Sequence, residues 1–481
     1  MSHRRDKKPQ AGTKEQQIAE MQEQLAQALA AIEKLKKQNE LLRVEIEGLK
    51  RAGKRQATPF ARRTWVEKAK RPGRKAGQGK FSRRERPTPK RIDETKKVKL
   101  HGCPECGGRL REIHQHEQYV ADIPKIRPII TRYVTYSGYC VGCRKRVRSR
   151  HPEQTSQATG AAGVTLAPAA SAGVVGPRAK ALAADLKHRL GGSYGKVSET
   201  LNDAFGLQVS RSGWCQADQR LGKSARGVYQ ELIEEMRRSS VAHVDETGWR
   251  INTLSAWLWV FTNQAATVYA IRDNRSSDVV VEILGRGFKG TLVSDCLMVY
   301  DDKRLAAWLK QKCLSHLLKD LKEMEESKTG RAVRFAQQLT TVLRAALELK
   351  AEKPNLDPVI FAQRAQALET QLDTLISQRR QLKDRDNLRF ARRLRKHRPH
   401  LLRFLYVDGL DATNNLAERQ LRPGVIIRKT NGCNRSKGGA DTHSVLTSVL
   451  VTCRQHSIPI LDYMVSLQRF GETPPPLAAP P

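Results

Sequence analysis

The order of apolar runs between residues 241 and 295 limits the possible folds of this chain more than any other feature of its sequence. Three runs typical of strands precede one helical run and a fourth strand, at 241–245, 256–261, 266–271, 276–284 and 290–295. This β-β-β-α-β order is the first half of a ribonuclease-H-like α/β core. Asp245 and Asp295 end the first and fourth strands, so we expect them on neighbouring strands.

Charge indicates the class of ligand. The 481 residues include 87 Lys and Arg against 49 Asp and Glu, a net charge of +38, which favours a polyanion such as nucleic acid. Apolar residues make up 39% of the chain, enough for folded cores. No apolar run reaches the length of a membrane span, and no secretory signal precedes the first domain. We therefore expect a cytoplasmic, nucleoid-associated protein without membrane contact.

Residues 14–50, which follow a basic tail at 1–13, carry a heptad repeat. Nine of its ten seam positions are apolar, and Asn39 is the polar exception. This pattern predicts a coiled coil through which two copies associate, with the asparagine fixing the register. The alternative is a single amphipathic helix that packs on its own chain.

A basic linker follows at 51–100, with 19 Lys and Arg against four acids. Arg71, Arg74 and Lys75 alternate with Pro and Gly, a composition that does not fold alone. Such a segment is able to lie along double-stranded DNA, and we predict that these three residues bind it. A solvated spacer is the alternative.

Two Cys-x-x-Cys pairs lie within residues 101–150, Cys103 with Cys106 and Cys140 with Cys143. Two such knuckles complete a tetrahedral four-thiolate site with no open position, so we predict one structural Zn²⁺. Residues 119–120 and 129–139 are expected to be strands, which gives a zinc ribbon. Free thiols or a redox pair are the alternative.

The rest of the chain is expected to be mainly helical. After a linker at 151–180, a helix at 194–205, a turn at 206–209 and a second helix at 210–221 give residues 181–237 a helix-turn-helix outline, although a hairpin without a DNA-reading role looks the same. A helical insertion at 301–412 separates the core segments 238–300 and 413–470. In it we expect a helix at 301–310, a strand at 311–316 and two long helices at 317–350 and 358–396. We further predict a helix over 413–422 that Pro423 stops, a helix at 442–456 and a disordered tail at 471–481.

Carboxylates at the end of a sheet suit phosphodiester chemistry. Two Mg²⁺ or Mn²⁺ ions are able to clamp the attacking and leaving oxygens, and they prefer hard oxygen ligands. Taken alone, an acid at the end of a strand is more often a turn residue than a metal ligand.

Three motifs resemble those of bacterial DDE transposases of the insertion-sequence-66 family. The first is His243-Val-Asp245-Glu-Thr-Gly-Trp249-Arg250, and the second is Gly290-Thr-Leu-Val-Ser-Asp295 with Tyr300 five residues on. The third and most specific runs from Asn414-Asn415-Leu-Ala-Glu418-Arg-Gln-Leu-Arg422-Pro423 to Arg428-Lys429. The resemblance covers nearly the whole chain, including the heptads, the linker, the cysteine pairs and the helical hairpin.

The resemblance implies that Asp245, Asp295 and Glu418 are the catalytic, Mg²⁺-binding triad. Glu246 points to the opposite face of its strand and is left out. Asn415 shares a helix face with Glu418, so it either supports the metal site or caps the helix.

Cys313 and His316 match the position of a Cys-x-x-His motif of that family, although the surrounding residues depart from the usual ones. They either support the site or are a packed cysteine and a structural or DNA-facing histidine. Arg419, Arg422, Arg428 and Lys429 follow the acidic helix, and we predict that they contact phosphates rather than only solvent.

These expectations together describe a transposase that binds terminal inverted repeats and catalyses Mg²⁺-dependent strand cleavage and strand transfer. Small accessory proteins of the element are possible partners. Three alternatives remain open: an inactive or domesticated DNA-binding relative, a metal-dependent nuclease on the same core, and a regulatory zinc and coiled-coil protein without metal-dependent chemistry.

Overall fold

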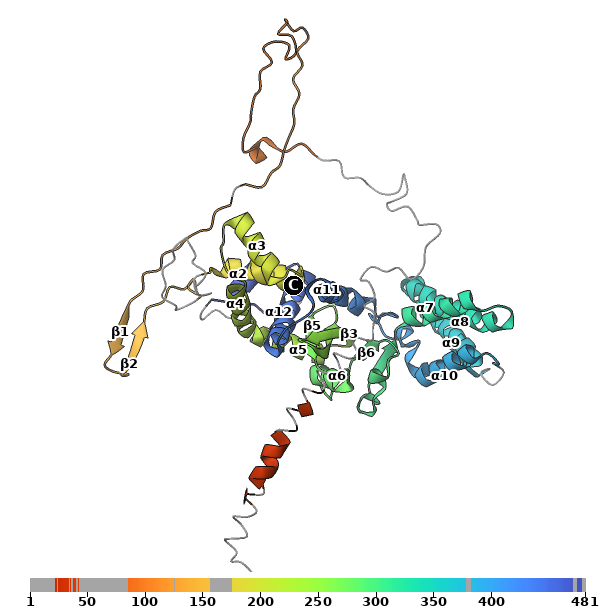
Figure 1. Ribbon diagram of the computed structural model, residues 1–481. Helices are drawn as coiled ribbons and strands as arrows, with labels where there is room; N and C mark the ends of the chain where they lie inside the picture. Colours follow the sequence, from red (N-terminus) through yellow and green to blue (C-terminus); the bar gives the residue numbers. More distant parts are fainter. Residues whose placement is uncertain are drawn as a thin grey trace, which may run out of the picture. The chain divides into compact units, whose positions relative to one another are not determined.

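A computed structural model describes residues 22–23, 25–33, 35, 38–39, 42, 85–124, 126–155, 175–377, 382–469 and 474–477. Contacts divide the chain into two compact units, one of residues 57–128 and one of residues 1–56 and 129–481. The core sheet, its covering helices and the insertion all belong to the larger unit (Figure 1). Arg71, Arg74 and Lys75 lie outside the described residues, so the predicted linker contacts with DNA stay predictions.

A five-stranded mixed sheet forms the centre of this unit, in the order β5-β4-β3-β6-β7. Its strands are β3 (Val241–Ile251), β4 (Leu254–Thr262), β5 (Thr267–Arg272), β6 (Thr291–Ser294) and β7 (Leu309–Lys312). β3 pairs antiparallel with β4 and parallel with β6, which in turn pairs parallel with β7. With α6 (Ser277–Leu284) before β6, the predicted order of three strands, a helix and a fourth strand is present. The assignment of this sheet to the ribonuclease-H-like fold stays a prediction.

Alternation along β3 and β4 gives the sheet two apolar faces. Val244 and Trp259 join a core cluster with α5 (Arg226–Arg238), α6 and α12 (Lys437–Gln455). Trp249 and Leu258 face the opposite way and pack against α11 (Asn415–Asn431). Because side chains alternate across a strand, Asp245 shares the face of Trp249, which is the face that α11 covers.

Hydroxyl groups of α12 cover the free edge of β5. The backbone amides of Thr267, Tyr269 and Ile271 donate to hydroxyl oxygens of α12 at 3.1, 2.8 and 3.0 Å. The acceptors are Thr452, Ser448 and Ser444, spaced by four residues on one side of the helix. The amides that an edge strand would leave unpaired are therefore satisfied by a helix.

Between Val175 and the sheet, where every residue is described, four α-helices follow one another: α2 (Pro177–Ala184), α3 (Tyr194–Phe205), α4 (Arg211–Ser224) and α5. The predicted helix at 194–205 is confirmed, and Gly206 ends it in a left-handed conformation with φ of 67°. The Ser210 hydroxyl accepts from the amide of Gly213 and caps α4, so the second helix of the hairpin is also confirmed. Whether the hairpin reads DNA stays a prediction.

The described residues of the insertion, which are all but 378–381, form four main helices where the sequence predicted two: α7 (Leu314–Ser327), α8 (Arg331–Glu352), α9 (Pro358–Ser377) and α10 (Arg385–His397). They share one apolar core. Gly330, with φ of 62°, separates α7 from α8, and Asp384 caps the start of α10. The apolar periodicity of the sequence continues across both breaks, so it did not reveal them. The predicted helix at 301–310 is instead two short 3₁₀ turns, and the strand lies at β7 rather than 311–316.

Pro423 does not stop α11, which continues for eight residues beyond it. At Gly424 the helix approaches β4 so closely that a Cβ atom would lie 2.3 Å from a methyl group of Leu258. Packing on the sheet therefore outweighs the hydrogen bond that proline removes. α12 begins five residues before the predicted helix, and α13 (Ile460–Ser466) follows it.

Part of the tail expected to be disordered is ordered. Leu477 is buried in the main core cluster, and the Tyr463 hydroxyl donates to the carbonyl oxygen of Pro475. A large apolar side chain in an otherwise Pro-rich tail gives it an anchor on the core. The expectation of disorder is wrong for these residues.

Near the cysteine pairs, the strands are β1 (Ser137–Cys140) and β2 (Lys145–Arg148), an antiparallel pair. Residues 119–120 and 129–136 are not strands, contrary to expectation, and Val120 and Ile129 are 77% and 94% exposed. These apolar side chains have no buried face to join. Among the described helices, none is long and apolar enough to cross a membrane.

Candidate active site

Asp245 and Asp295 lie at the same level of two parallel strands. His243 of β3 pairs with Val293 of β6, so the two aspartates, each two residues further on, follow the last paired positions. β3 itself continues to Ile251 in its antiparallel pairing with β4. Asp245 therefore lies within the strand, and the prediction that it ends the strand is wrong. Both side chains are half-buried.

Glu418 reaches this level from the first turn of α11. Asn414 fixes where the helix begins, since its side-chain amide donates to the Val244 carbonyl oxygen at 2.8 Å and its backbone amide donates to Cys313 Sγ at 3.1 Å. The amide of Glu418 in turn donates to the Asn414 carbonyl oxygen. The start of α11 is thus tied to the residue before Asp245 and to the start of α7.

The negative charges of Asp295 and Glu418 both act on Asp245. Its pKa is raised to about 7, chiefly by burial and then by the charge of Glu246, with Asp295 and Glu418 adding smaller effects and a hydrogen bond from the Glu246 amide opposing them. A bound cation would offset this accumulated negative charge. A set of hard oxygen donors from β3, the end of β6 and α11 fits Mg²⁺ or Mn²⁺.

His316 and Cys313 also lie at this site. His316 Nδ1 is 3.7 Å from Glu418 Oε1, and donor atoms of Cys313, His316 and Glu418 all lie within 4.8 Å of one another. The hydrogen bond with Cys313 raises the pKa of His316 to about 9, and the charges of Cys313, Glu418 and Asp295 add to this against the effect of burial. The structure thus places the Cys-x-x-His motif of Cys313 and His316 next to Glu418. With a pKa of about 9, His316 carries a positive charge at neutral pH.

A buried network that the sequence did not reveal lies behind the triad. Glu246 accepts from Arg275 and from the hydroxyl of the fully buried Tyr300, and it takes no part in the cluster of donors around Glu418. Lys312, also fully buried, donates to the carbonyl oxygen of Asp295 at 3.0 Å and pairs with Asp301 at 3.2 Å. In the sequence, Lys312 is only a lysine beside an apolar run, and this pattern does not predict its contacts with Asp295 and Asp301.

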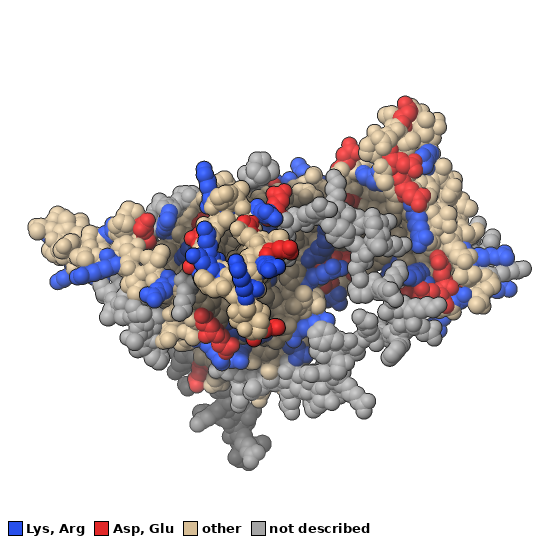
Figure 2. Space-filling view, turned by 90° about the horizontal axis from the view of Figure 1, so that it is seen from above, with Lys and Arg blue, Asp and Glu red and all other residues tan. Residues whose placement is uncertain are grey.

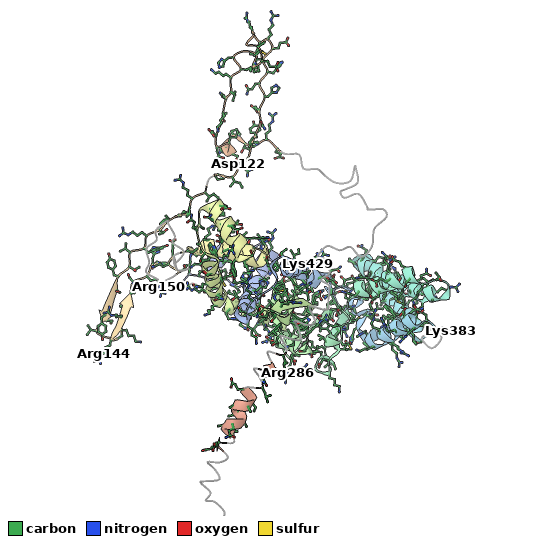
Figure 3. All side chains as sticks on the ribbon, in the orientation of Figure 1. Asp122, Arg144, Arg150, Arg286, Lys383 and Lys429 are labelled. Atoms are coloured by element: carbon green, nitrogen blue, oxygen red, sulfur yellow. The ribbon has the colours of Figure 1, made fainter. Side chains whose placement is uncertain are left out.

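The predicted DNA-contact residues on α11 separate into two groups. Arg419, Arg422 and Lys429, the last labelled in Figure 3, are exposed on one side of the helix. Arg428 instead turns inward and donates to the Thr247 hydroxyl oxygen at 3.0 Å and to the Gly248 carbonyl oxygen, so it fastens α11 to β3. Asn415 is exposed at the first position of the helix, and Asn414, not Asn415, makes the contacts there.

Each cysteine pair forms a tight turn. Backbone amides of Glu105 and Cys106 lower the pKa of Cys103, and the amide of Cys143 has the largest lowering effect on the pKa of Cys140. The Cys103 carbonyl oxygen accepts from Gly107, which has φ of 73°. Lowered thiol pKa values favour the thiolate that a metal needs. Joint binding of one Zn²⁺ by both pairs stays a prediction.

Comparison with known proteins places these residues in a sequence family. The model of the transposase IS66 family matches residues 172–442, more than half of the chain, a span that contains Asp245, Asp295 and Glu418. A curated relative, the uncharacterised protein y4qI of Sinorhizobium fredii, is 24% identical over 294 residues. The match covers 54% of this chain and 53% of that protein, so the chain spans about half the length of the relative it matches.

Proposed function

Because this chain belongs to the transposase IS66 family, we propose that it binds the terminal inverted repeats of an insertion sequence and cleaves and joins DNA strands there. Two observations support the chemical part of the proposal: Asp245 and Asp295 follow the same paired level of β3 and β6, and the charges of Asp295 and Glu418 raise the pKa of Asp245. Asp245, Asp295 and Glu418 are separated by up to 173 residues in sequence, yet their charges act on one another.

Asp245, Asp295 and Glu418 would hold two Mg²⁺ or Mn²⁺ ions. When bound, such ions activate an oxygen nucleophile and stabilise the charge that develops on a phosphodiester. Cleavage would free a 3′-hydroxyl, and that hydroxyl would attack a phosphodiester of the target. No covalent protein–DNA intermediate is required, so no serine or tyrosine is assigned.

Other residues of the chain position the triad. Lys312 holds the backbone at Asp295, and Asn414 holds the first turn of α11 against β3. His316 places a positive charge beside Glu418, which lowers the repulsion among the acids before any ion arrives. These contacts preorganise the site, so that little rearrangement is needed when DNA binds.

The remaining elements supply DNA and partner contacts in this proposal. Arg419, Arg422 and Lys429 form a basic face beside the triad, where phosphates would lie. The hairpin of α3 and α4, the cysteine pairs and the basic linker would recognise the inverted repeats. The heptad segment would join two copies, and accessory proteins of the element would assist.

A strand-transfer assay with Mg²⁺, labelled element-end DNA and a supercoiled target tests the chemistry. We expect Asp245→Asn and Glu418→Gln to lower cleavage and joining by about a thousandfold or more, because several kcal/mol of charge stabilisation is lost. DNA binding should persist in both variants. Glu326→Gln, which changes an exposed acid of α7, is the matched control and should keep full activity.

The outcomes separate the alternatives. Cleavage that survives Asp245→Asn would refute the triad. Cleavage without joining would indicate a metal-dependent nuclease. Binding with neither activity, even after the neighbouring gene products are added, would indicate an inactive relative.

A further inference from the structure

Helix α10 carries a stripe of positive charge along one face, here called the α10 stripe: Arg385, Arg389, Arg392 and Lys396. All four side chains are exposed. Their spacing of four, three and four residues places them within an arc of about 60° at 100° per residue. Arg395 is exposed beside them, and Lys383, labelled in Figure 3, precedes the helix.

The three arginines of the stripe lack the partners that other arginines of the insertion have. Figure 2 shows Lys and Arg interspersed with Asp and Glu on one face of the molecule. In the insertion, Arg364, Arg393 and Arg398 form ion pairs with carboxylates. On α10 itself, Arg393 turns inward, donates to Asp320 at 2.6 Å and stacks on the ring of Phe390. Among the described residues, no carboxylate pairs with Arg385, Arg389 or Arg392.

The two acids at the start of α10 do not neutralise the stripe. Asp384 accepts from the amides of Asp386 and Asn387 as the helix cap. Lys328 then pairs with both Asp384 and Asp386 at 2.9 Å. Lys328 offsets one of these two negative charges, and the one that remains is outnumbered by the three arginines of the stripe.

The C-terminal end of the stripe connects to the candidate active site. Lys396 pairs with Asp301 at 2.6 Å, and Asp301 pairs with Lys312, which donates to the carbonyl oxygen of Asp295. This chain of contacts fixes α10 relative to one member of the triad. A polyanion that leaves the site on this side would meet the stripe.

We propose that the α10 stripe binds the phosphate backbone of duplex DNA next to the phosphodiester that the triad attacks. The contact with DNA rests on charge and geometry, and its place beside the cleaved bond rests on the proposed function. From Arg385 to Lys396 the helix rises about 16 Å, which matches about five base pairs at 3.4 Å each. Guanidinium groups suit phosphates because they donate two parallel hydrogen bonds.

Duplex binding measured over a range of salt concentrations tests the charge contact. The variant combines Arg385→Gln, Arg389→Gln and Arg392→Gln in the full chain. Loss of three phosphate contacts should make the slope of log affinity against log salt shallower by about 2 to 3, and affinity at low salt should fall roughly tenfold or more. The same three positions changed to Lys should keep the slope.

A second triple variant controls for net charge: Arg334→Gln, Arg344→Gln and Arg364→Gln. It removes three exposed positive charges from α8 and α9 of the same insertion. We expect the slope of this control to remain near that of the unchanged chain. Equal slopes for the two glutamine triples would overturn the proposal, as would a stripe variant that binds duplex DNA like the unchanged chain.

Hydroxyl-radical footprinting on element-end DNA tests the position. The stripe variant should lose protection over about five base pairs on one side of the cleaved bond and keep it elsewhere. Loss spread evenly over the DNA would overturn the assigned position. The binding measurement needs neither Mg²⁺ nor cleavage, so stripe-dependent binding by a chain that never cleaves would refute the proposed chemistry and leave the stripe standing.

Discussion

Lys312 is a fully buried cation between the sheet and the insertion, and its charge is compensated by Asp301 and by the Asp295 carbonyl oxygen. We expect Lys312→Met to lower the free energy of unfolding by about 3 kcal/mol or more, because it leaves buried acceptors without their partner. Urea unfolding followed by circular dichroism measures this.

Lys396 offers a matched control, since it pairs with the same Asp301 from a half-exposed position. Lys396→Met should cost less than about 1 kcal/mol, because solvent screens an exposed pair. Equal costs for the two substitutions would show that Lys312 is not held by the contacts described.

Burial of histidines in the insertion predicts a loss of stability in acid. Burial and the positive charge of Lys312 lower the pKa of His397 from its ordinary 6.5 to about 4, with Asp301 opposing. His400, which faces Lys310, Lys312, Arg403 and Asp301, has its pKa lowered to about 4 as well. Below pH 6.5 the unfolded chain therefore binds protons that the folded chain refuses, so the free energy of unfolding falls between pH 6.5 and about 4.

The variant His397→Gln should make the decrease in the free energy of unfolding between pH 6.5 and 4 smaller by up to about 3 kcal/mol. The part of the decrease that is due to His400 should remain. Urea unfolding at pH 6.5, 5.5 and 4.5 measures the difference between the variant and the unchanged chain. Parallel curves for the two proteins would contradict the assignment to His397.

The three acids were proposed from the sequence because each lies in a family motif, although Asp245 lies within its strand and not at its end. It was not enough to find Asn414 or the position of Cys313, since the contact between them joins residues 101 apart. The sequence also offers no reason to distinguish Arg428 from Arg422. In the structure, Arg428 fastens α11 to β3, whereas Arg422 is exposed. Such differences depend on tertiary packing that local patterns do not contain.

At the scale of elements, the hydroxyl groups of α12 replace a neighbouring strand for β5. We expect Ser448→Ala to lower the free energy of unfolding by about 1 to 3 kcal/mol, because it leaves the buried amide of Tyr269 without an acceptor. Thermal or urea unfolding gives the value.

Thr341→Ala serves as the comparison, since its hydroxyl is exposed and donates only within its own helix α8. Its effect should stay within about 0.5 kcal/mol. A loss for Ser448→Ala no larger than this would mean that another group satisfies the amide.

Element boundaries show where sequence patterns were sufficient. The predicted bounds of α3 agree with the structure, where Ser193 caps the helix and Gly206 ends it through local contacts. The helix α11 was predicted too short because its continuation past Pro423 depends on the close contact of Gly424 with Leu258. The division of the insertion into four main helices was missed because apolar periodicity runs on across the breaks.

At the scale of the whole molecule, the heptad segment predicts self-association. Its seam positions Leu25, Ile32, Leu35 and Leu42 are among the described residues, and all are about half exposed or more. In a coiled coil, an apolar seam of this kind pairs with the seam of a second helix. Deletion of residues 1–50 should convert a dimer into a monomer, as measured by sedimentation equilibrium.

Substitution of Leu25, Ile32 and Leu35 by Ala in the full-length chain should give the same result, whereas Glu23→Gln, Gln27→Ala and Glu33→Gln together should not. An unchanged mass after the deletion would place the interface elsewhere in the molecule.

Because the hydroxyl groups of α12 accept hydrogen bonds from the amides of β5, the edge of the sheet is completed late in the synthesis of the chain. The hydroxyl acceptors leave the ribosome 173 to 185 residues after the amides they satisfy, about 10 to 40 seconds later at ordinary rates of translation. Glu418 emerges only shortly before them. Until then, the nascent chain has an open sheet edge and two of the three acids of the proposed triad. A product truncated before α11 would therefore be prone to aggregate and, under the proposed function, inert.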